Sequence, residues 1–414
     1  MLGQVVDLGQ RLAGLMPLPV LLAGVVAAGV AAWAFIWALQ PFAGRLGLLD
    51  HPHSERKDHG RPTPVTGGLG MILALALFFT LAPVPMSPAR WSFLLGSLLL
   101  IVVGLLDDYR DLRWWWRILA QVAAALIMVY LGDVRVEQLG RVFGFQDLSL
   151  GPWSVPFTVF ATVGVINAVN MIDGADGIGG MLLAAALLML AAAALYAGND
   201  ALFYVALSVM AVVLGFLAHN FPLPWRPKAR VFMGNAGSGF LGFAIAWIIF
   251  RLTQNPVHQV SPALALWLLP VPVMDCLVLI VRRWREGRSP FDAGRDHIHH
   301  IMRDAGFSAG GLALALTAFS LATGLAAAVA MLMDVPDPWL LVAFLGLCGL
   351  WYWLTFRRAR AVAFFAAMEP GPAAQRRRAM QRAENAADAD LGVGGVGPGV
   401  GGVAPTYAPQ SRDP

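Results

Sequence analysis

The stretch VPFTVFATVGVINAVNMIDGADGIGGMLLAAALLMLAAAAL, residues 155–195, decides the fold of this chain. Two apolar runs flank a short turn that carries two carboxylates, Asp173 and Asp176. Each run is long enough to cross a hydrocarbon core about 30 Å thick. Inside lipid such a run must be helical, because every backbone polar group has to be satisfied within the segment. The stretch therefore predicts two membrane-spanning helices joined by an acidic turn.

The same apolar pattern recurs along the chain. Of its 414 residues, 58% are hydrophobic and only 13% are charged, whereas globular chains carry about 25% charged residues. We therefore expect an all-α, polytopic integral membrane protein with about eleven transmembrane helices. The expected spans are residues 17–39, 65–82, 92–106, 117–132, 154–171, 180–197, 201–219, 237–253, 262–281, 311–333 and 339–356. The first run leads directly into further spans, so we interpret it as a retained helix and not a cleaved signal peptide.

Lysine and arginine are distributed unequally between the two sets of loops. The basic set comprises residues 40–64, 107–117, 226–230, 282–303 and the tail from 357, whereas the other set holds only Arg11, Arg90, Arg135, Arg141 and Arg251. Cytoplasmic loops carry the excess of basic residues. The distribution therefore predicts an N-terminus outside and a C-terminus in the cytoplasm. The net charge of +4 then reflects topology and attraction to anionic lipid, and no nucleic-acid partner is expected.

The chain divides into two parts by composition. Residues 1–368 form the predicted transmembrane domain, and residues 369–414 are polar and then glycine-rich, as in LGVGGVGPGVGG. Such a composition predicts a disordered cytoplasmic tail. Cys276 and Cys348 each lie within an apolar span, which indicates small buried side chains and neither a disulfide nor a metal site.

The concentrated polar clusters all fall on the predicted cytoplasmic side. They occupy residues 51–68, 107–117, 167–177, 230–239 and 289–306. Acids, bases and glycines from five separate segments would converge there. We therefore expect the active site on the cytoplasmic face.

Asp107 and Asp108 end an apolar helix at this face, with three arginines, Arg110, Arg113 and Arg117, close behind. Adjacent carboxylates repel each other, so they suit a site where a cation offsets their charge or where one of them acts as a base. The mixture of acids and arginines favours a phosphate and metal site. The alternative is a solvated helix end.

Asp173 and Asp176 lie among glycines, which permit tight turns and close approach of the backbone to a ligand. Asn167 and Asn170 precede them by one or two helical turns and add amides that could contact a base, a sugar or a metal. The alternative is an exposed interfacial turn.

The stretch DHIHHIMRD brings His297, His299 and His300 together with Arg295 and Arg303. Phosphate binding by imidazole and guanidinium groups is favoured over a zinc site, because no cysteine accompanies the histidines. A solvated loop remains an alternative.

Two further polar residues stand out. Asn235 lies in the turn FMGNAGSG, which enters a predicted span and could bind phosphate through backbone N–H groups. Asp275 lies inside a span, where ionisable residues are rare, and we interpret it as structural or supporting. Together the clusters indicate a metal-dependent phosphate reaction at the membrane surface. Mg²⁺ fits this chemistry because it prefers oxygen ligands and bridges carboxylates to phosphates, and Mn²⁺ is an alternative.

The motifs RKDHGRPTPVTGG, LLDDYRDL, NAVNMIDGADG, VFMGNAGS and RDHIHHIMRDAGFS, in this order, resemble those of the polyprenyl-phosphate N-acetylhexosamine-1-phosphate transferases. The resemblance runs from the first span to the last. The His-x-His-His block and the segment LGRVFGFQDLSLGP are most similar to the WecA-type branch, and less similar to the MraY branch with its muramyl pentapeptide donor.

The resemblance implies transfer of N-acetylglucosamine 1-phosphate from UDP-GlcNAc to undecaprenyl phosphate, with release of UMP. The product would start the synthesis of a cell-surface glycan of the O-antigen type at the bacterial cytoplasmic (inner) membrane. A homodimer is compatible with this interpretation.

The resemblance also implies roles for individual residues. The implied catalytic residues are Asp107, Asp108, Asp173 and Asp176, with Asp107 as a candidate base. The implied substrate-binding residues are Lys57, Arg117, Asn170, Phe232, Arg295, His297, His299 and His300, and the implied metal ligands are Asn170, Asp176 and Asn235.

Two departures from the family pattern bear on these roles. Asn235 stands where the family has an aspartate that binds Mg²⁺ directly, and an amide brings no charge to that position. The chain also reads GRDHIHH where the WecA-type branch usually reads DRQHIHH, which moves an acid from position 294 to Asp296. The alternatives are a different UDP-N-acetylhexosamine donor, a weakly active or inactive relative, and a transporter. A transporter is disfavoured because its polar groups would lie near the bilayer midplane.

Overall fold

The computed structural model describes residues 18–50, 62–81, 86–254, 260–289, 294–368 and 379. The helices are α2 (Leu18–Leu39), α3 (Gly67–Leu81), α4 (Pro88–Arg110), α5 (Trp114–Gly132), α6 (Ser154–Ile172), α7 (Ile178–Tyr196), α8 (Asp200–Asn220), α9 (Gly234–Thr253), α10 (Pro262–Leu268), α11 (Pro270–Arg285), α12 (Ile298–Asp304), α13 (Ala309–Leu332), α14 (Asp337–Phe356) and α15 (Arg358–Met368). Two 3₁₀ turns, η1 (Gln40–Phe42) and η2 (Gly151–Trp153), and one short antiparallel pair, β1 (Leu49–Asp50) with β2 (Thr63–Pro64), complete the described elements. The predicted all-α class is confirmed.

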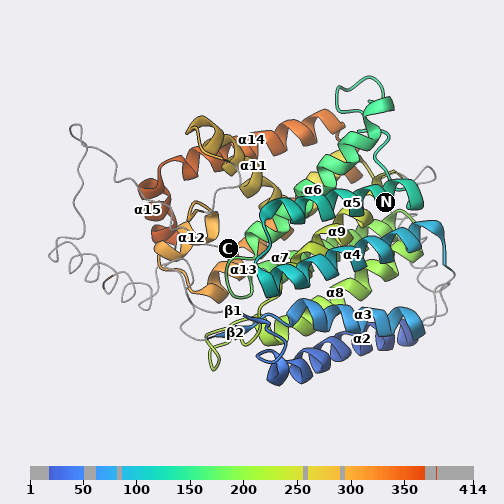
Figure 1. Ribbon diagram of the computed structural model, residues 1–414. Coiled ribbons are helices and arrows are strands. Elements are labelled where there is room, and N and C mark those ends of the chain that lie inside the picture. The colour runs from blue at the N-terminus through green and yellow to red at the C-terminus, as the bar shows by residue number, and fades with distance from the viewer. Residues whose placement is uncertain are drawn as a thin grey trace, which may run out of the picture.

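The long helices lie side by side as a bundle, and β1, β2, α12 and α15 gather at one end of it (Figure 1). Helix α4 packs against α5 and α9, while α6 packs against α5 and α9 and α2 packs against α3 and α8. The polar clusters at residues 107–117, 167–177 and 230–239 lie at helix ends on the same side as β1 and β2. We call this side the polar end of the bundle.

The predicted spans are largely confirmed. In the part of the chain that the structure describes, nine helices are long and apolar enough to cross a membrane. Helix α3 coincides with a predicted span but has only 15 residues, which at about 1.5 Å per residue is shorter than a hydrocarbon core. The predicted domain boundary at 368 and the predicted tail involve residues that lie almost entirely outside the described part.

The expectation of one continuous span over residues 262–281 is wrong. Helices α10 and α11 meet there at an angle of 91°, and Leu269 between them has φ −137° and ψ 51°. The break follows from Pro270, because the residue before a proline avoids the helical conformation and proline itself donates no backbone hydrogen bond. The break sets the direction of α11 independently of α10, and α11 carries residues of the site described below.

Helix α9 is the most buried span, with 89% of its apolar window inside the structure. Its first turns, GNAGSG, are small enough for neighbouring backbones to approach closely. A Cβ atom at Gly104 of α4 would collide with the backbone of Ala236, and one at Gly68 of α3 would lie 2.8 Å from the carbonyl oxygen of Met233. Backbone contacts therefore fix the start of α9 against α3 and α4.

We expect Gly104→Ala to lower the melting temperature of the purified protein, because the added methyl group meets a backbone that cannot move aside. Overpacking of this kind costs about 1–3 kcal/mol. Gly346→Ala in α14 is the matched control, since its Cβ would meet no atom within 4 Å. Thermal unfolding in detergent measures both variants, and equal melting temperatures would contradict the close contact between α4 and α9.

Candidate functional site

The start of α9 is held by the acidic end of α4. The carboxylate of Asp108 accepts hydrogen bonds from the backbone N–H groups of Asn235 at 2.8 Å and Ala236 at 3.3 Å. A helix N-terminus presents unpaired N–H groups and a partial positive charge, so it stabilises a carboxylate. Gly234 adopts φ +76°, and a Cβ there would lie 2.5 Å from Asp108 Oδ2. The turn therefore requires glycine, and Asp108 determines where Asn235 lies.

Asp107 has a different set of contacts from its neighbour. Its buried carboxylate accepts a hydrogen bond from the backbone N–H of Leu112 at 2.8 Å and from the guanidinium group of Arg117 at 3.4 Å. A solvated helix end is therefore the wrong interpretation of Asp107. The contact instead orients Arg117, which projects from the first turn of α5.

A cavity of about 540 Å³ lies between α4, α5, α6, α9 and α11. Its walls are mostly apolar and include Leu100, Val103, Ile118, Phe160 and Ile166. At the polar end of the bundle the cavity meets Arg117, Asn170, Asn235, Arg283 and His297. The cavity thus joins an apolar groove to a cluster of cationic and amide groups.

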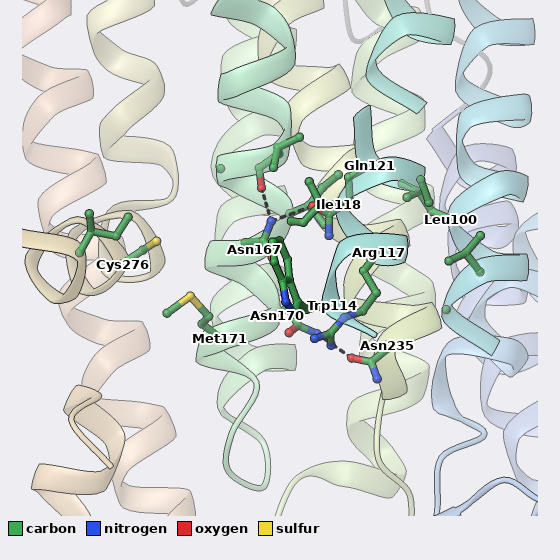
Figure 2. Close-up of a pocket in the computed structure, with 18 of the residues that line it drawn as sticks. Leu100, Trp114, Arg117, Ile118, Gln121, Asn167, Asn170, Met171, Asn235 and Cys276 are labelled. Atoms are coloured by element: carbon green, nitrogen blue, oxygen red, sulfur yellow. Dashed lines mark hydrogen bonds between the residues drawn. The ribbon is translucent and has the colours of Figure 1, made fainter. Parts of the chain in front are cut away.

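Four side chains meet at this polar end. The amide nitrogen of Asn170 donates to Asn235 Oδ1 at 3.0 Å and to the Ser238 hydroxyl at 2.9 Å. Figure 2 shows Arg117 pointing toward the same two asparagines. The structure thus brings together residues that the sequence places on three different helices.

Asn167 lies deeper in the cavity and has a structural contact. Its amide nitrogen donates to Gln121 Oε1 at 2.7 Å and to the carbonyl oxygen of Val163 at 2.8 Å (Figure 2). The bond to Gln121 links α5 to α6 along the groove, and the bond to Val163 lies within α6. The sequence analysis did not identify Gln121 as a site residue, because it is a single polar residue in an apolar segment.

His297 lines the cavity, and the carboxylate of Asp275 holds its ring in place. Its Nδ1 lies 2.8 Å from Asp275 Oδ2, and Asp275 Oδ1 accepts a hydrogen bond from the backbone N–H of Ile298 at 3.1 Å. A carboxylate beside Nδ1 favours the proton on that nitrogen. The supporting role expected for Asp275 is confirmed by these contacts.

Arg283 is a site residue that the sequence analysis missed. It lines the cavity from α11 with a side chain only 2% exposed, and its guanidinium group lies 3.8 Å from Asp296. Asp296, the displaced acid of the histidine block, also pairs with Arg288 at 3.4 Å. The sequence analysis used the basic run only as evidence of orientation. Arg282 and Arg283 are both buried, but of the two only Arg283 lines the cavity.

The acidic turn between α6 and α7 contains one compensated and one uncompensated carboxylate. Asp176 Oδ2 accepts a hydrogen bond from the backbone N–H of Ala229 at 2.8 Å. Asp173 is partly buried and accepts no hydrogen bond from the residues that the structure describes. Burial, and next the charge of Asp176, raise the pKa of Asp173 to about 7. The exposed-turn alternative is therefore wrong for Asp173.

The histidine segment packs directly on this acidic turn. His299 is 1% exposed, and a Cβ at Gly174 would lie 2.5 Å from its Nε2. Neither ring nitrogen of His299 has a hydrogen-bond partner among the described residues. Burial, and next the charges of His300 and His297, hold the pKa of His299 well below its usual range. The imidazole is therefore neutral at pH 7, and its two ring nitrogens remain available for hydrogen bonds.

Some predicted site residues are not placed on the cavity. Arg295 is exposed, lies 3.8 Å from Asp304 and accepts a hydrogen bond from Arg358 through its carbonyl oxygen. Phe232 is half-buried, and its backbone pairs with Pro64 of β2 and with Gly67, the first residue of α3. Lys57 lies outside the described residues.

The residues at the polar end fit Mg²⁺ better than zinc. Across the described ranges, no group of three or more histidines, cysteines and acids is arranged to hold a metal ion. Magnesium needs only one or two protein carboxylates beside substrate phosphates and water. Asp173 offers a carboxylate whose charge nothing described compensates, and Asp176, Asn170 and Asn235 add further oxygen donors. Which of these residues bind metal stays a prediction.

The chain is similar in sequence to known transferases over the segments that form this site. Residues 90–253, which span most of α4 and all of α5–α9, match Glycosyl transferase family 4. The undecaprenyl-phosphate alpha-N-acetylglucosaminyl 1-phosphate transferase of Escherichia coli O157:H7 is 33% identical over 335 residues, which are 80% of this chain and 89% of that protein. A protein of the same name from Yersinia pestis is 32% identical over 339 residues, or 80% of this chain and 90% of the relative. Another from Haemophilus influenzae is 32% identical over 270 residues, or 65% and 76%.

We expect the stability of the protein to fall with rising pH because of Asp173. The folded pKa of about 7 lies above the ordinary value of about 3.9, so the folded state holds a proton that the unfolded state releases between these values. The contribution of Asp173 to the free energy of unfolding is fully present below about pH 4 and is lost as the pH rises toward 7. Asp173→Asn should therefore melt about 2–4 °C above the parent at pH 8, with a smaller difference at pH 5.

Melting curves from pH 5 to 8.5 in the absence of divalent cations measure this effect. Asp147→Asn is the control, because Asp147 is a half-exposed surface acid that lies 3.9 Å from Arg141. A constant difference between Asp173→Asn and the parent across this range would show that Asp173 does not titrate near neutral pH.

Proposed function

Because the chain belongs to the polyprenyl-phosphate N-acetylhexosamine-1-phosphate transferases of glycosyl transferase family 4, we propose that it transfers N-acetylglucosamine 1-phosphate from UDP-GlcNAc to undecaprenyl phosphate. The protein is a multi-pass membrane protein and a phospho-sugar transferase. The observation that carries the specific proposal is the cavity, which joins an apolar groove to a cationic end.

The cavity suits a lipid phosphate as the acceptor. An isoprenoid chain would lie along Leu100, Ile118 and Phe160, where its apolar surface packs against apolar side chains. Its phosphate would then meet Arg117 and Arg283, because guanidinium groups bind phosphate oxygens through paired hydrogen bonds. A mostly apolar pocket with a few convergent polar groups is typical of a small-molecule site.

The acidic turn and the histidine segment suit the nucleotide-sugar donor. His297 and His299 lie with ring centroids 5.4 Å apart beside the turn that holds Asp173. The neutral ring of His299 can hydrogen-bond to a diphosphate or a sugar without bringing a full charge. Magnesium, when bound, would offset the negative charge of the diphosphate and hold it against Asp173 and Asp176.

The proposed reaction is a direct phosphoryl transfer. An oxygen of the lipid phosphate attacks the sugar-linked phosphorus of UDP-GlcNAc, a new P–O bond forms, and the bond to the UMP phosphate breaks. UMP leaves with the bonding electron pair. The lipid phosphate is ionised near pH 7, so catalysis rests on positioning and charge stabilisation. Both oxygens of Asp107 have partners, which supports a role in orienting Arg117 over the role of a base.

Asn235 determines how strongly the site holds its metal ion. Its amide oxygen already accepts a hydrogen bond from Asn170, and a neutral amide attracts a divalent cation less than a carboxylate does. We propose that the chain needs a higher Mg²⁺ concentration than a variant with aspartate at this position.

Transfer of radiolabelled sugar phosphate from UDP-GlcNAc to undecaprenyl phosphate by the purified protein tests the proposal. We expect turnover by the parent, and we expect Asn235→Asp to reach half-maximal rate at a Mg²⁺ concentration about tenfold lower. UDP-N-acetylgalactosamine in a parallel reaction tests the choice of donor. Absence of turnover in both proteins with either donor would refute the proposal, whereas activity of Asn235→Asp alone would identify the parent as a disabled transferase.

We expect a side chain placed in the groove to weaken acceptor binding alone. Gly164 lines the cavity, and a Cβ there would meet no atom within 4 Å, so Gly164→Leu fills the groove without a clash. The KM for undecaprenyl phosphate should rise about tenfold, because the apolar chain loses contact area. The KM for UDP-GlcNAc should stay constant.

Gly346→Leu is the matched control, since its Cβ also meets open space and the residue lies on α14, away from the cavity. An unchanged acceptor KM in Gly164→Leu, or an equal rise in KM for both substrates, would show that the groove does not bind the acceptor.

A further inference from the structure

A second, smaller cavity lies at the opposite end of the bundle from the polar end. It has a volume of about 60 Å³ and is formed where the first turns of α4 and α8 meet the last turns of α9. One water molecule needs about 10–15 Å³ on this scale, so the cavity holds a group of a few oxygen-sized atoms. A phosphate group fits this volume.

Two arginines line this cavity from different helices. Arg90 of α4 and Arg251 of α9 lie close enough for their charges to repel each other. The guanidinium carbon of Arg251 lies 5.9 Å from the centre of the Trp247 ring, and Arg251 forms no ion pair with an acid of the described residues. Two like charges facing one small cavity favour an anionic occupant, because its charge relieves the repulsion.

Trp247 adds an independent indication of a ligand. It lines the same cavity, is only 4% exposed, and its indole N–H has no hydrogen-bond partner among the described residues. A buried donor without a partner costs about 1–3 kcal/mol. Indole nitrogen is only a donor, so the group that would satisfy it is an acceptor such as a phosphate oxygen.

The helix ends around the cavity have the same electrostatic preference. Ser87 caps α4 by accepting a hydrogen bond from the backbone N–H of Arg90 at 3.3 Å, and Asn199 caps α8 by accepting from Leu202 at 3.1 Å. Both caps line the cavity, so the partial positive charges of two helix N-termini face it. Asp200, the first residue of α8, is exposed and does not line the cavity.

We propose that this cavity binds the phosphate group of a membrane phospholipid. The site lies at the ends of three membrane-spanning helices, which is the depth at which lipid phosphates lie. Trp91 and Met86 beside it are half-exposed and apolar, at 50% and 47%, and tryptophan at a span end is typical of the membrane interface. The lysine and arginine distribution predicts that this end lies outside the cytoplasm, so the lipid would belong to the leaflet opposite the proposed transferase site.

Native mass spectrometry of the delipidated protein in detergent, titrated with phosphatidylglycerol, tests the proposal. We expect Arg251→Gln to weaken the tightest lipid-binding step about tenfold, because it removes a charge-assisted hydrogen bond. Trp247→Phe should weaken the same step about threefold, since it keeps the ring and removes the N–H donor. Arg135→Gln is the matched control: this arginine lies at the same end of the bundle, pairs with Glu137 at 2.9 Å and does not line the cavity.

A titration with inorganic phosphate in place of lipid distinguishes the two sources of the phosphate group. Phospholipid binding that falls in Arg251→Gln and Trp247→Phe but not in Arg135→Gln would support the proposal. Equal lipid affinity in Arg251→Gln and Arg135→Gln would overturn it. Binding of inorganic phosphate with the same dependence on Arg251, without a matching loss of lipid, would overturn the lipid as the occupant. Melting temperatures without lipid show whether each variant remains folded.

Discussion

The contact between the Asp108 carboxylate and the first backbone N–H groups of α9 is the interaction on which the rest of the site depends. A charged side chain at the end of an apolar helix needs compensation, and the N-terminus of a neighbouring helix supplies it without a second full charge. The contact works only because Gly104 and Gly234 let the two backbones come together. It places Asn235 against Asn170, and so joins α4, α6 and α9 at one point.

The acids of the site differ in how their charges are compensated, and this difference separates their roles. Asp107 and Asp108 are occupied by hydrogen bonds within the protein, so they hold Arg117 and α9 in place. Asp275 likewise holds His297. Asp173 is the exception among the four, because it is partly buried beside another acid without a described donor. A carboxylate in that state gains most from a cation, and this supports placing the metal–nucleotide complex at the acidic turn.

The two ends of the bundle present different chemistry to the two sides of a membrane. One end combines acids, histidines and arginines around an apolar groove, which suits the proposed reaction between a nucleotide sugar and a lipid phosphate. The other end has few basic residues, and two of them, Arg90 and Arg251, share a cavity with a buried tryptophan. The same physical rule applies at both ends, because a charge at the edge of lipid is stabilised by an opposite charge, by backbone polar groups or by water.

The sequence by itself determined the class of fold, the helical segments and the family, because apolar length and motif order are local properties that the chain displays directly. It also identified most side chains at the polar end, since charged residues are conspicuous in an apolar chain. It could not show the break at Leu269, where Pro270 interrupts an apolar run, or the burial of Arg283 within a basic run. It could not tell that Asp108 binds a helix end while Asp173 lacks a donor. Those distinctions depend on which backbone groups from distant segments lie nearby, and only the packing of α4, α6, α9 and α11 decides that.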